Sequence, residues 1–227
     1  MDQLIIGDKA SFDDFVASIA TRKIKMPKKK SIKETVPFSN ITYDFSAING
    51  ETYWEERELE YGFEIIADDP ETLEELKSSF SAWVMGVANH KLHDPFIPDY
   101  HFLATYSDMK QDDDEGLDKC TLTVTFTAYP YKIANTPKVY ARVYAPSERW
   151  IIDVLNESDH PVSLTIANTV EIGVAIDSGG VTSIVTIPAG NGTYSALKLP
   201  KGQQSIAVSN NEAKEGTVSI IFSEEVI

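Results

Sequence analysis

A strictly alternating run at residues 121–128, followed closely by a proline, constrains this chain more than any other feature. Threonine occupies every odd position, and the even positions are Leu122, Val124, Phe126 and Ala128. A period of two is typical of a β-strand with one buried face. Pro130 has no backbone N–H to donate, so the strand must end there or lie at a sheet edge. The run therefore predicts a β-rich fold.

The second half of the chain repeats this kind of pattern in shorter pieces. Prolines at 130, 137 and 146 precede the first of these shorter pieces, and domain boundaries usually lie in segments of that kind. Apolar alternation marks strands around Trp150/Ile152/Val154, Val162/Leu164/Ile166, Ile172/Val174/Ile176 and Val218/Ile220/Phe222. Turn-forming glycine, asparagine and proline residues separate these strands. We therefore expect two domains, residues 1–137 and 138–227, the second an all-β sandwich.

The first half combines strands with one helix. Residues 58–65 alternate between glutamate or glycine and large apolar side chains, which predicts a strand with an acidic face. Asp69 followed by Pro70 is a helix start signal, and apolar residues then recur at spacings of three and four until about Gly86. The predicted fold class is therefore mainly β with one α-helix: an N-terminal β-sandwich-like domain plus this helix, then the C-terminal sandwich.

Charge and motifs exclude several functional classes. The net charge is −15, and the acidity is concentrated in residues 34–137. Because nucleic-acid affinity depends on cations that neutralise phosphates, we expect no tight nucleic-acid binding. No apolar run approaches the ~18 residues of a membrane helix, and the N-terminus lacks the layout of a secretion signal. These observations predict synthesis in the cytoplasm and no membrane partner.

Six lysines near the N-terminus form the one basic segment. They are Lys23, Lys25, Lys28, Lys29, Lys30 and Lys33. Clustered like charges usually lie in solvent, so we interpret the segment as an exposed arm or loop. A tail that binds nucleic acid is the alternative. Contact with the acidic part of a neighbouring copy is the interpretation that we favour.

Candidate catalytic and metal-binding residues are weak. His90, His93, Asp94, Asp99 and His101 resemble a ligand cluster, but their spacing fits a zinc site only loosely. Residues 111–116 resemble a calcium loop but lack its required positions, so an acidic hairpin tip is the better interpretation. Cys120 opens a strand, where a small packing residue is expected. We therefore predict no enzyme activity, no metal and no cofactor.

Several segments, taken in order, are similar to sequence motifs of one known protein family. Residues 36–46 (VPFSNITYDFS) are similar to the family's Pro-Gly-x-x-Gly-x-x-Asp-Phe/Tyr-Ser segment, although Phe38 and Ile41 replace its glycines. Residues 53–58 (YWEERE) are similar to its Tyr-x-x-Arg-x-Ile/Leu strand. Tyr129, Pro130 and Tyr131 belong to a segment that is similar to the signature closing the family's first domain. Together these segments resemble the distal tail protein (Dit) family of long-tailed phages and prophages of Gram-positive bacteria.

This resemblance implies a structural role in a virion. Family members form a hexameric ring at the tail tip, which joins the tail tube to the tail-tip hub and the receptor-binding apparatus and lets DNA pass. The implied partners are other copies of the chain, the tail tube protein, the tail-tip hub protein and the receptor-binding protein. The second domain would be galectin-like. Acidic side chains that could line the channel are Glu58, Glu60, Glu64, Asp112, Asp113, Asp114 and Glu115.

Two other functions compete with a structural hub. The second domain could be a lectin that binds carbohydrate on the host surface, because galectin-type sites stack a sugar on a tryptophan. Trp150 is the only tryptophan in that half, and its apolar neighbours favour a place in the core. A glycoside hydrolase is the third class. It ranks last because no carboxylate stands in the apolar setting that raises the pKa of a general acid.

Overall fold

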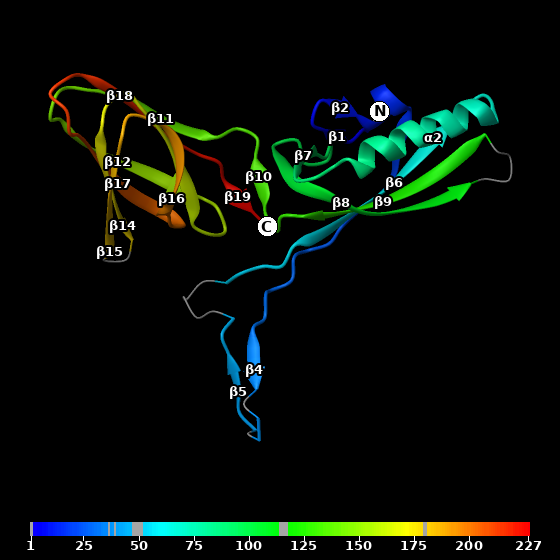
Figure 1. Cartoon of the computed structure of the whole chain (residues 1–227), viewed down its shortest axis with the longest axis horizontal. Helices are drawn as coiled ribbons and strands as arrows, with labels where there is room; N and C mark the ends of the chain where they lie inside the picture. Colours follow the sequence, from blue (N-terminus) through cyan, green and yellow to red (C-terminus); the bar gives the residue numbers. More distant parts are fainter. Residues whose placement is uncertain (1, 36, 39, 47–51, 114–117, 179–180) are drawn as a thin grey trace. The chain divides into compact units, whose positions relative to one another are not determined.

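The structure is a computed structural model that describes residues 2–35, 37–38, 40–46, 52–113, 118–178 and 181–227. The chain divides into two compact units: unit 1 comprises Met1–Lys132 together with Ile227, and unit 2 comprises Ile133–Val226. Strands dominate both units, which confirms the predicted mainly-β class (Figure 1). No helix among the described residues is long and apolar enough to span a bilayer.

Unit 1 is built on one antiparallel sheet with the strand order β2-β1-β7-β8-β9-β6-β3. The strands are β1 (Ile5–Ile6), β2 (Lys9–Ala10), β3 (Ala17–Ile24), β6 (Arg57–Ile66), β7 (His90–His93), β8 (Tyr100–Asp113) and β9 (Lys119–Ala128). The predicted alternation in β9 is confirmed, because every second side chain is buried. Cys120 is one of these buried residues. The strand ends at Ala128, two residues before Pro130.

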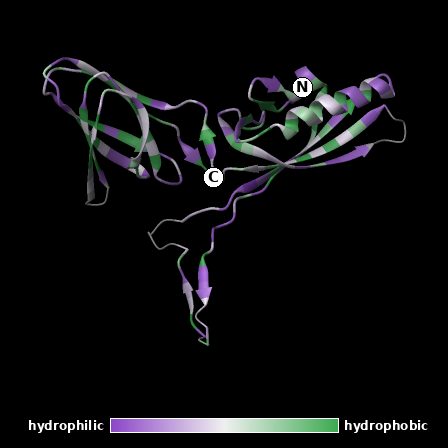
Figure 2. Cartoon of the chain, in the orientation of Figure 1, coloured by the Kyte–Doolittle hydropathy of each residue, from purple (hydrophilic) through white to green (hydrophobic). Residues whose placement is uncertain are grey.

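Helix α2 (Pro70–Met85) begins and ends as the sequence predicts. Asp69 is its N-cap, and a carboxylate oxygen of Asp69 accepts a hydrogen bond of 2.9 Å from the backbone N–H of Thr72. Phe80 and Val84 are fully buried on the face that packs against the unit 1 core. Hydrophobic and hydrophilic residues alternate around the helix (Figure 2).

A second helix, α1 (Ser11–Phe15), was not predicted, so the expectation of a single helix is wrong. It has no side-chain N-cap, and at 5 residues it is too short to show a helical period. Phe15 holds it in place by stacking on Trp83 of α2, with ring centroids 4.8 Å apart.

Two further strands of unit 1, β4 (Lys33–Thr35) and β5 (Thr42–Asp44), form a separate two-stranded sheet. They pair antiparallel, and Glu34 lies opposite Tyr43. All six residues of the two strands are exposed.

Unit 2 is a sandwich of two four-stranded sheets. One sheet has the order β11-β18-β13-β16 and the other β12-β17-β14-β15. The strands are β11 (Lys138–Tyr144), β12 (Arg149–Asn156), β13 (Val162–Asn168), β14 (Ile172–Ser178), β15 (Val181–Ile187), β16 (Gly190–Leu199), β17 (Gly202–Asn210) and β18 (Gly216–Phe222). Inward-facing residues of both sheets form one core, as the alternation predicts. Short strands β10 (Lys132–Ala134) and β19 (Glu225–Val226) complete the elements.

Two turns of unit 2 are held in the same way by an asparagine side chain, although the sequence shows no internal repeat. Asn156 ends β12 and donates its side-chain amide to the carbonyl of Pro200 at 3.2 Å. Asn168 ends β13 and donates in the same way to the carbonyl of Pro188 at 2.9 Å. Both prolines lie in Pro-x-Gly turns that connect strands, so a buried asparagine fixes each turn.

Candidate functional site

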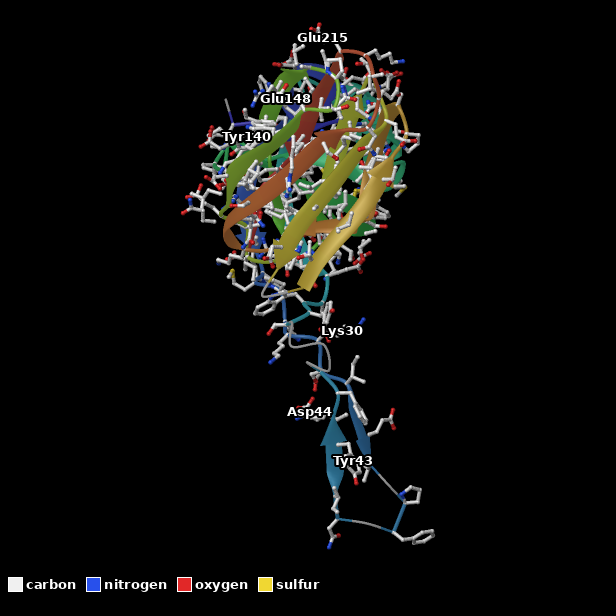
Figure 3. The ribbon with its side chains drawn as sticks, turned by 90° about the vertical axis from the view of Figure 1, so that its left-hand side faces the viewer. Lys30, Tyr43, Asp44, Tyr140, Glu148 and Glu215 are labelled. Carbon is white, nitrogen blue, oxygen red and sulfur yellow. The ribbon has the colours of Figure 1, made fainter. Side chains whose placement is uncertain are left out.

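The most exposed element of unit 1 is the hairpin that joins β3 to β6 through β4 and β5. Its two arms continue the antiparallel pairing of the sheet. The backbone N–H of Glu55 donates to the carbonyl of Lys28 at 2.8 Å, and that of Lys30 donates to the carbonyl of Tyr53 at 2.8 Å. Beyond these bonds lies the β4–β5 ladder, and Figure 3 shows Lys30, Tyr43 and Asp44 along the hairpin.

Large apolar side chains of the hairpin are exposed to solvent. The described ones include Met26, Ile32, Phe38, Tyr43 and Phe45, with exposed fractions from 40% for Phe45 to full exposure for Phe38. A two-stranded hairpin without a packed face is only marginally stable in water. Clustered exposed apolar residues mark interaction surfaces in soluble proteins. The hairpin therefore has the properties of a segment that becomes buried against another surface.

The turn of the hairpin contains a backbone conformation that favours glycine. Phe38 has a φ of 63°, in the left-handed region that costs a non-glycine residue free energy. This is the position at which the resembling family has glycine. Phe38 therefore holds a left-handed backbone conformation in spite of its side chain, and that side chain is fully exposed.

One of the six N-terminal lysines, Lys23, lies in a strand rather than in a loop, and Lys25 follows that strand directly. Lys23 lies in β3, opposite Glu60 of β6, and its Nζ is 3.6 Å from the Glu60 carboxylate. Lys25 follows the strand, and its Nζ lies 2.5 Å from the Glu58 carboxylate. The hydrogen bond between them raises the pKa of Lys25 and lowers the pKa of Glu58.

The other four lysines lie on the hairpin. Lys28, Lys29, Lys30 and Lys33 are all exposed. Within the described ranges of the chain, no carboxylate lies within 4.0 Å of their ammonium groups. These four side chains are therefore the part of the basic segment that can meet the carboxylates of another molecule.

The carboxylates expected in a channel differ in their surroundings. Glu64 forms a salt bridge with Lys119, so each of the three β6 glutamates has a lysine partner in the same chain. Asp112 is exposed on β8. The side chain of Asp113, and Asp114 and Glu115 as a whole, lie outside the described residues. The acidic face of β6 therefore carries less net negative charge than the sequence suggests.

Asp94, which the sequence placed in a metal-like cluster, has a structural role. Its carboxylate is fully buried and accepts hydrogen bonds from Arg22 Nε at 2.6 Å and from the Tyr61 hydroxyl at 2.7 Å. Burial and this carboxylate raise the pKa of Tyr61. His93 and His101 lie ring to ring at 5.4 Å. Across the part of the chain that the structure describes, no group of three or more histidine, cysteine, aspartate or glutamate residues could hold a metal ion.

Arg57 belongs to the segment 53–58 and was not among the candidate site residues of the sequence analysis. Only 3% of it is exposed, and its Nε has no hydrogen-bond partner among the described residues. Its guanidinium lies over the Phe102 ring, 5.5 Å from the centroid. Burial lowers its pKa. The alternation of β6 is a signal that could have identified it, because Arg57 shares the buried face with Leu59 and Tyr61.

The remaining predicted residues lie outside the hairpin. Tyr129 is exposed and Tyr131 is buried, and their rings are 5.5 Å apart at the end of unit 1. Pro130 between them is buried. In unit 2 the guanidinium of Arg142 lies over the Trp150 ring, 5.4 Å from its centroid. That ring therefore already has a cation on one face, which disfavours stacking with a sugar.

Two solved structures are similar to this chain over nearly its whole length. The first is SPP1 Dit (gp 19.1), described as a paradigm of the hub adsorption apparatus in phages that infect Gram-positive bacteria. It matches with a TM-score of 0.69 and 10% sequence identity over 100% of both chains. The second is a chain of the phage P2 baseplate in its activated conformation with Ca, with a TM-score of 0.52 and 9% identity over 97% of this chain and 98% of that chain.

No protein-family model and no curated protein matches the chain. The similarity is therefore one of three-dimensional structure. The chain has the fold of these phage proteins, and the resemblance inferred from its sequence motifs is confirmed at that level.

Proposed function

We propose that this chain is a structural protein of a phage tail tip, in which six copies form a ring. The ring would join the tail tube to the tail-tip apparatus and let DNA pass through its centre. The observation that carries this proposal is the full-length match to SPP1 Dit at 10% identity. If the two chains shared only one domain, the match would cover only part of each chain. Here the match covers both units, including the sheet from which the hairpin extends.

The proposed partners are other copies of the chain, the tail tube protein, the tail-tip hub protein and the receptor-binding protein. The location would be the virion tail tip, after synthesis and assembly in the cytoplasm of the bacterial host. Catalysis has no part in this proposal. The role needs rigid surfaces, and the sheets of both units supply them.

The hairpin supports a ring of identical subunits. Cyclic symmetry gives every copy the same neighbour on each side, so one exposed element per chain can be buried in every copy. The apolar hairpin residues would pack against the neighbour's unit 1. Lys28, Lys29, Lys30 and Lys33 would approach its carboxylates, which are abundant in a chain with 35 acidic and 20 basic residues.

The proposal for the channel is electrostatic. Duplex DNA carries one negative charge per ~1.7 Å of its axis, so a basic wall would retain it and an acidic wall would not. Of the candidate residues, Asp112 is exposed, whereas Glu58, Glu60 and Glu64 are neutralised in part by lysines. We therefore assign a larger share of the repulsion to exposed aspartates such as Asp112 than to the β6 face.

The mass of the full chain in solution tests the ring. Native mass spectrometry and light scattering, over a wide range of protein concentration, should give six times the chain mass of 25.2 kDa. A matched pair of variants locates the contact. Tyr43→Ser on the hairpin should lower the hexamer fraction, and Ile66→Ser, at a comparably exposed position on β6, should not. A strict monomer at the highest concentration would overturn the proposal.

A further inference from the structure

Strand β15 differs from the other terminal strands of the two unit 2 sheets. An unpaired sheet edge can pair with a strand of another molecule, and proteins commonly prevent this with charged side chains. The other three terminal strands follow this rule: β12 carries Arg149 and Asp153, β11 carries Arg142, and β16 carries Lys198, all exposed. The seven residues of β15, Val181–Ile187, include neither a charge nor a proline.

An apolar row on the outer face of this sheet ends at β15. Ile151 of β12 lies opposite Ala207 of β17, Ala207 lies opposite Ala175 of β14, and Ala175 lies opposite Ile184 of β15. The two isoleucines are strongly exposed, 60% for Ile151 and 74% for Ile184. The edge therefore combines free backbone groups with an exposed apolar side chain, in a strand that lies beside β14 (Figure 1).

The sequence of β15 is partly symmetric about Ile184. Position 182 and position 186 are both threonine, positions 181 and 187 are both β-branched and apolar (valine and isoleucine), and positions 183 and 185 differ (serine and valine). We propose that β15 pairs antiparallel with β15 of a second copy of this chain, about a twofold axis at Ile184. The two four-stranded sheets would then form one continuous sheet, and the apolar row would cross the junction without interruption.

The chemistry of the strand favours a second copy over other partners. A twofold axis requires self-complementarity, which an edge that receives a different strand does not need. With Ile184, Thr182 and Thr186 facing their counterparts, the antiparallel pattern supplies about six backbone hydrogen bonds. The absence of charge in β15 also avoids the repulsion that would otherwise oppose contact between two chains of net charge −15.

The contact should be weak in isolation. One strand pair buries less than the ~1,000 Å² that a stable interface needs. Its effect would grow when several copies are held in one assembly, since each further contact then forms within the same complex. A trapping experiment is therefore more suitable than a measurement of mass.

Disulfide trapping tests the pairing in the full-length protein. Residues that exchange hydrogen bonds across an antiparallel pair have Cα atoms ~5.5 Å apart, within the range that a disulfide spans. Ile184→Cys should give a covalent dimer under mild oxidation, at least about tenfold faster than Ile151→Cys. That control has an exposed isoleucine on the same sheet face but on the charged edge strand. The natural Cys120 is buried, so it adds little background.

A mixing experiment tests the direction of the strands. Thr182→Cys and Thr186→Cys should cross-link with each other more than either does with itself, because an antiparallel pair brings position 182 of one copy to position 186 of the second. Equal trapping of Ile184→Cys and Ile151→Cys would overturn the proposal. So would trapping that occurs only with another tail protein, or preferential self-linking of the Thr182→Cys variant. None of these results depends on the mass of a ring, so the two proposals can fail separately.

Discussion

Replacing Arg57 by methionine should stabilise unit 1, whereas the same replacement of Arg22 should destabilise it. Both arginines contact the unit 1 core, but only Arg22 has a carboxylate partner, Asp94, at 2.6 Å. Only 3% of Arg57 is exposed, its Nη2 donates a long hydrogen bond of 4.0 Å to the neutral sulfur of Met26, and its Nε has no hydrogen-bond partner among the described residues. Methionine keeps the length of the side chain and removes the charge.

The magnitudes follow from desolvation. A buried ion without a partner costs several kcal/mol, and replacement of buried charges by apolar side chains of similar volume is often stabilising by ~1–4 kcal/mol. The contact of Arg57 with the Phe102 ring offsets about 0.5–2 kcal/mol of that. We therefore expect Arg57→Met to stabilise unit 1 by roughly 1–2 kcal/mol.

Removal of Arg22 leaves the buried Asp94 carboxylate with weaker partners. Breaking a fully buried pair costs ~3–5 kcal/mol. Here the side chain of Arg22 is 30% exposed, and the Tyr61 hydroxyl and the Phe96 N–H still donate to the carboxylate. We therefore expect a loss of about 2–4 kcal/mol for Arg22→Met. With a slope of about 2 kcal/mol per M urea, the unfolding midpoint should fall by roughly 1–2 M.

Urea unfolding followed by tryptophan fluorescence measures both variants. The background should be Trp150→Phe, so that the signal comes from unit 1, where Trp83 stacks on Phe15. Opposite shifts of the midpoint are the expected result. If Arg57→Met loses as much stability as Arg22→Met, the burial of Arg57 without a carboxylate partner does not cost net free energy, and the reasoning is refuted.

Three further predictions concern the hairpin and its charges. Phe38→Gly should relieve the strain of the positive φ and so stabilise the hairpin locally by about 1 kcal/mol, which hydrogen exchange of the hairpin measures. The same change should weaken the oligomer because it removes an exposed aromatic ring, and native mass spectrometry measures that effect. Glutamates at positions 28–30 should weaken the oligomer, most at low ionic strength where charges are least screened; unchanged mass across a salt series would contradict this. Glu58→Gln should make the free energy of unfolding of unit 1 depend less on pH in the acid range. The folded state lowers the pKa of Glu58, so Glu58 contributes stability that is present above its ordinary pKa of 4.5 and is lost as the pH falls below that value. Urea midpoints at successive pH values measure this dependence, with the exposed Glu56→Gln as control.

Local patterns were sufficient to predict the elements whose causes lie within a few residues. The alternation at 121–128 predicts β9 because a pleated strand sends successive side chains to opposite faces. Asp69 and Pro70 predict the start of α2 because the cap and the fixed φ act on the first turn itself. The core residues of unit 2 follow from the same period of two.

Features that depend on long-range pairing could not be read from the sequence. Lys25 and Glu58 lie 33 positions apart, and only the β3–β6 register brings them together. The same holds for Asn156, whose amide fixes a turn 44 positions away. The short helix α1 is held by a ring of α2 rather than by a cap of its own, so it has no local signal. In each case the missing information is which strand or helix lies next to which.

The charge pattern of unit 1 shows how such pairing changes a functional argument. The sequence presents a basic segment beside an acidic strand, which suggests that both are available to other subunits. In the structure Lys23 and Lys25 already pair with Glu60 and Glu58, since β3 and β6 are neighbours. Exposed pairs of this kind are each worth about 0–1 kcal/mol, so they stabilise the sheet little, but they neutralise one another. Lys28, Lys29, Lys30 and Lys33, which have no carboxylate within 4.0 Å among the described residues, lie on the hairpin beside its exposed apolar side chains. A contact made by the hairpin would therefore combine apolar burial with a salt-dependent attraction, whereas the β6 face would contribute little of either.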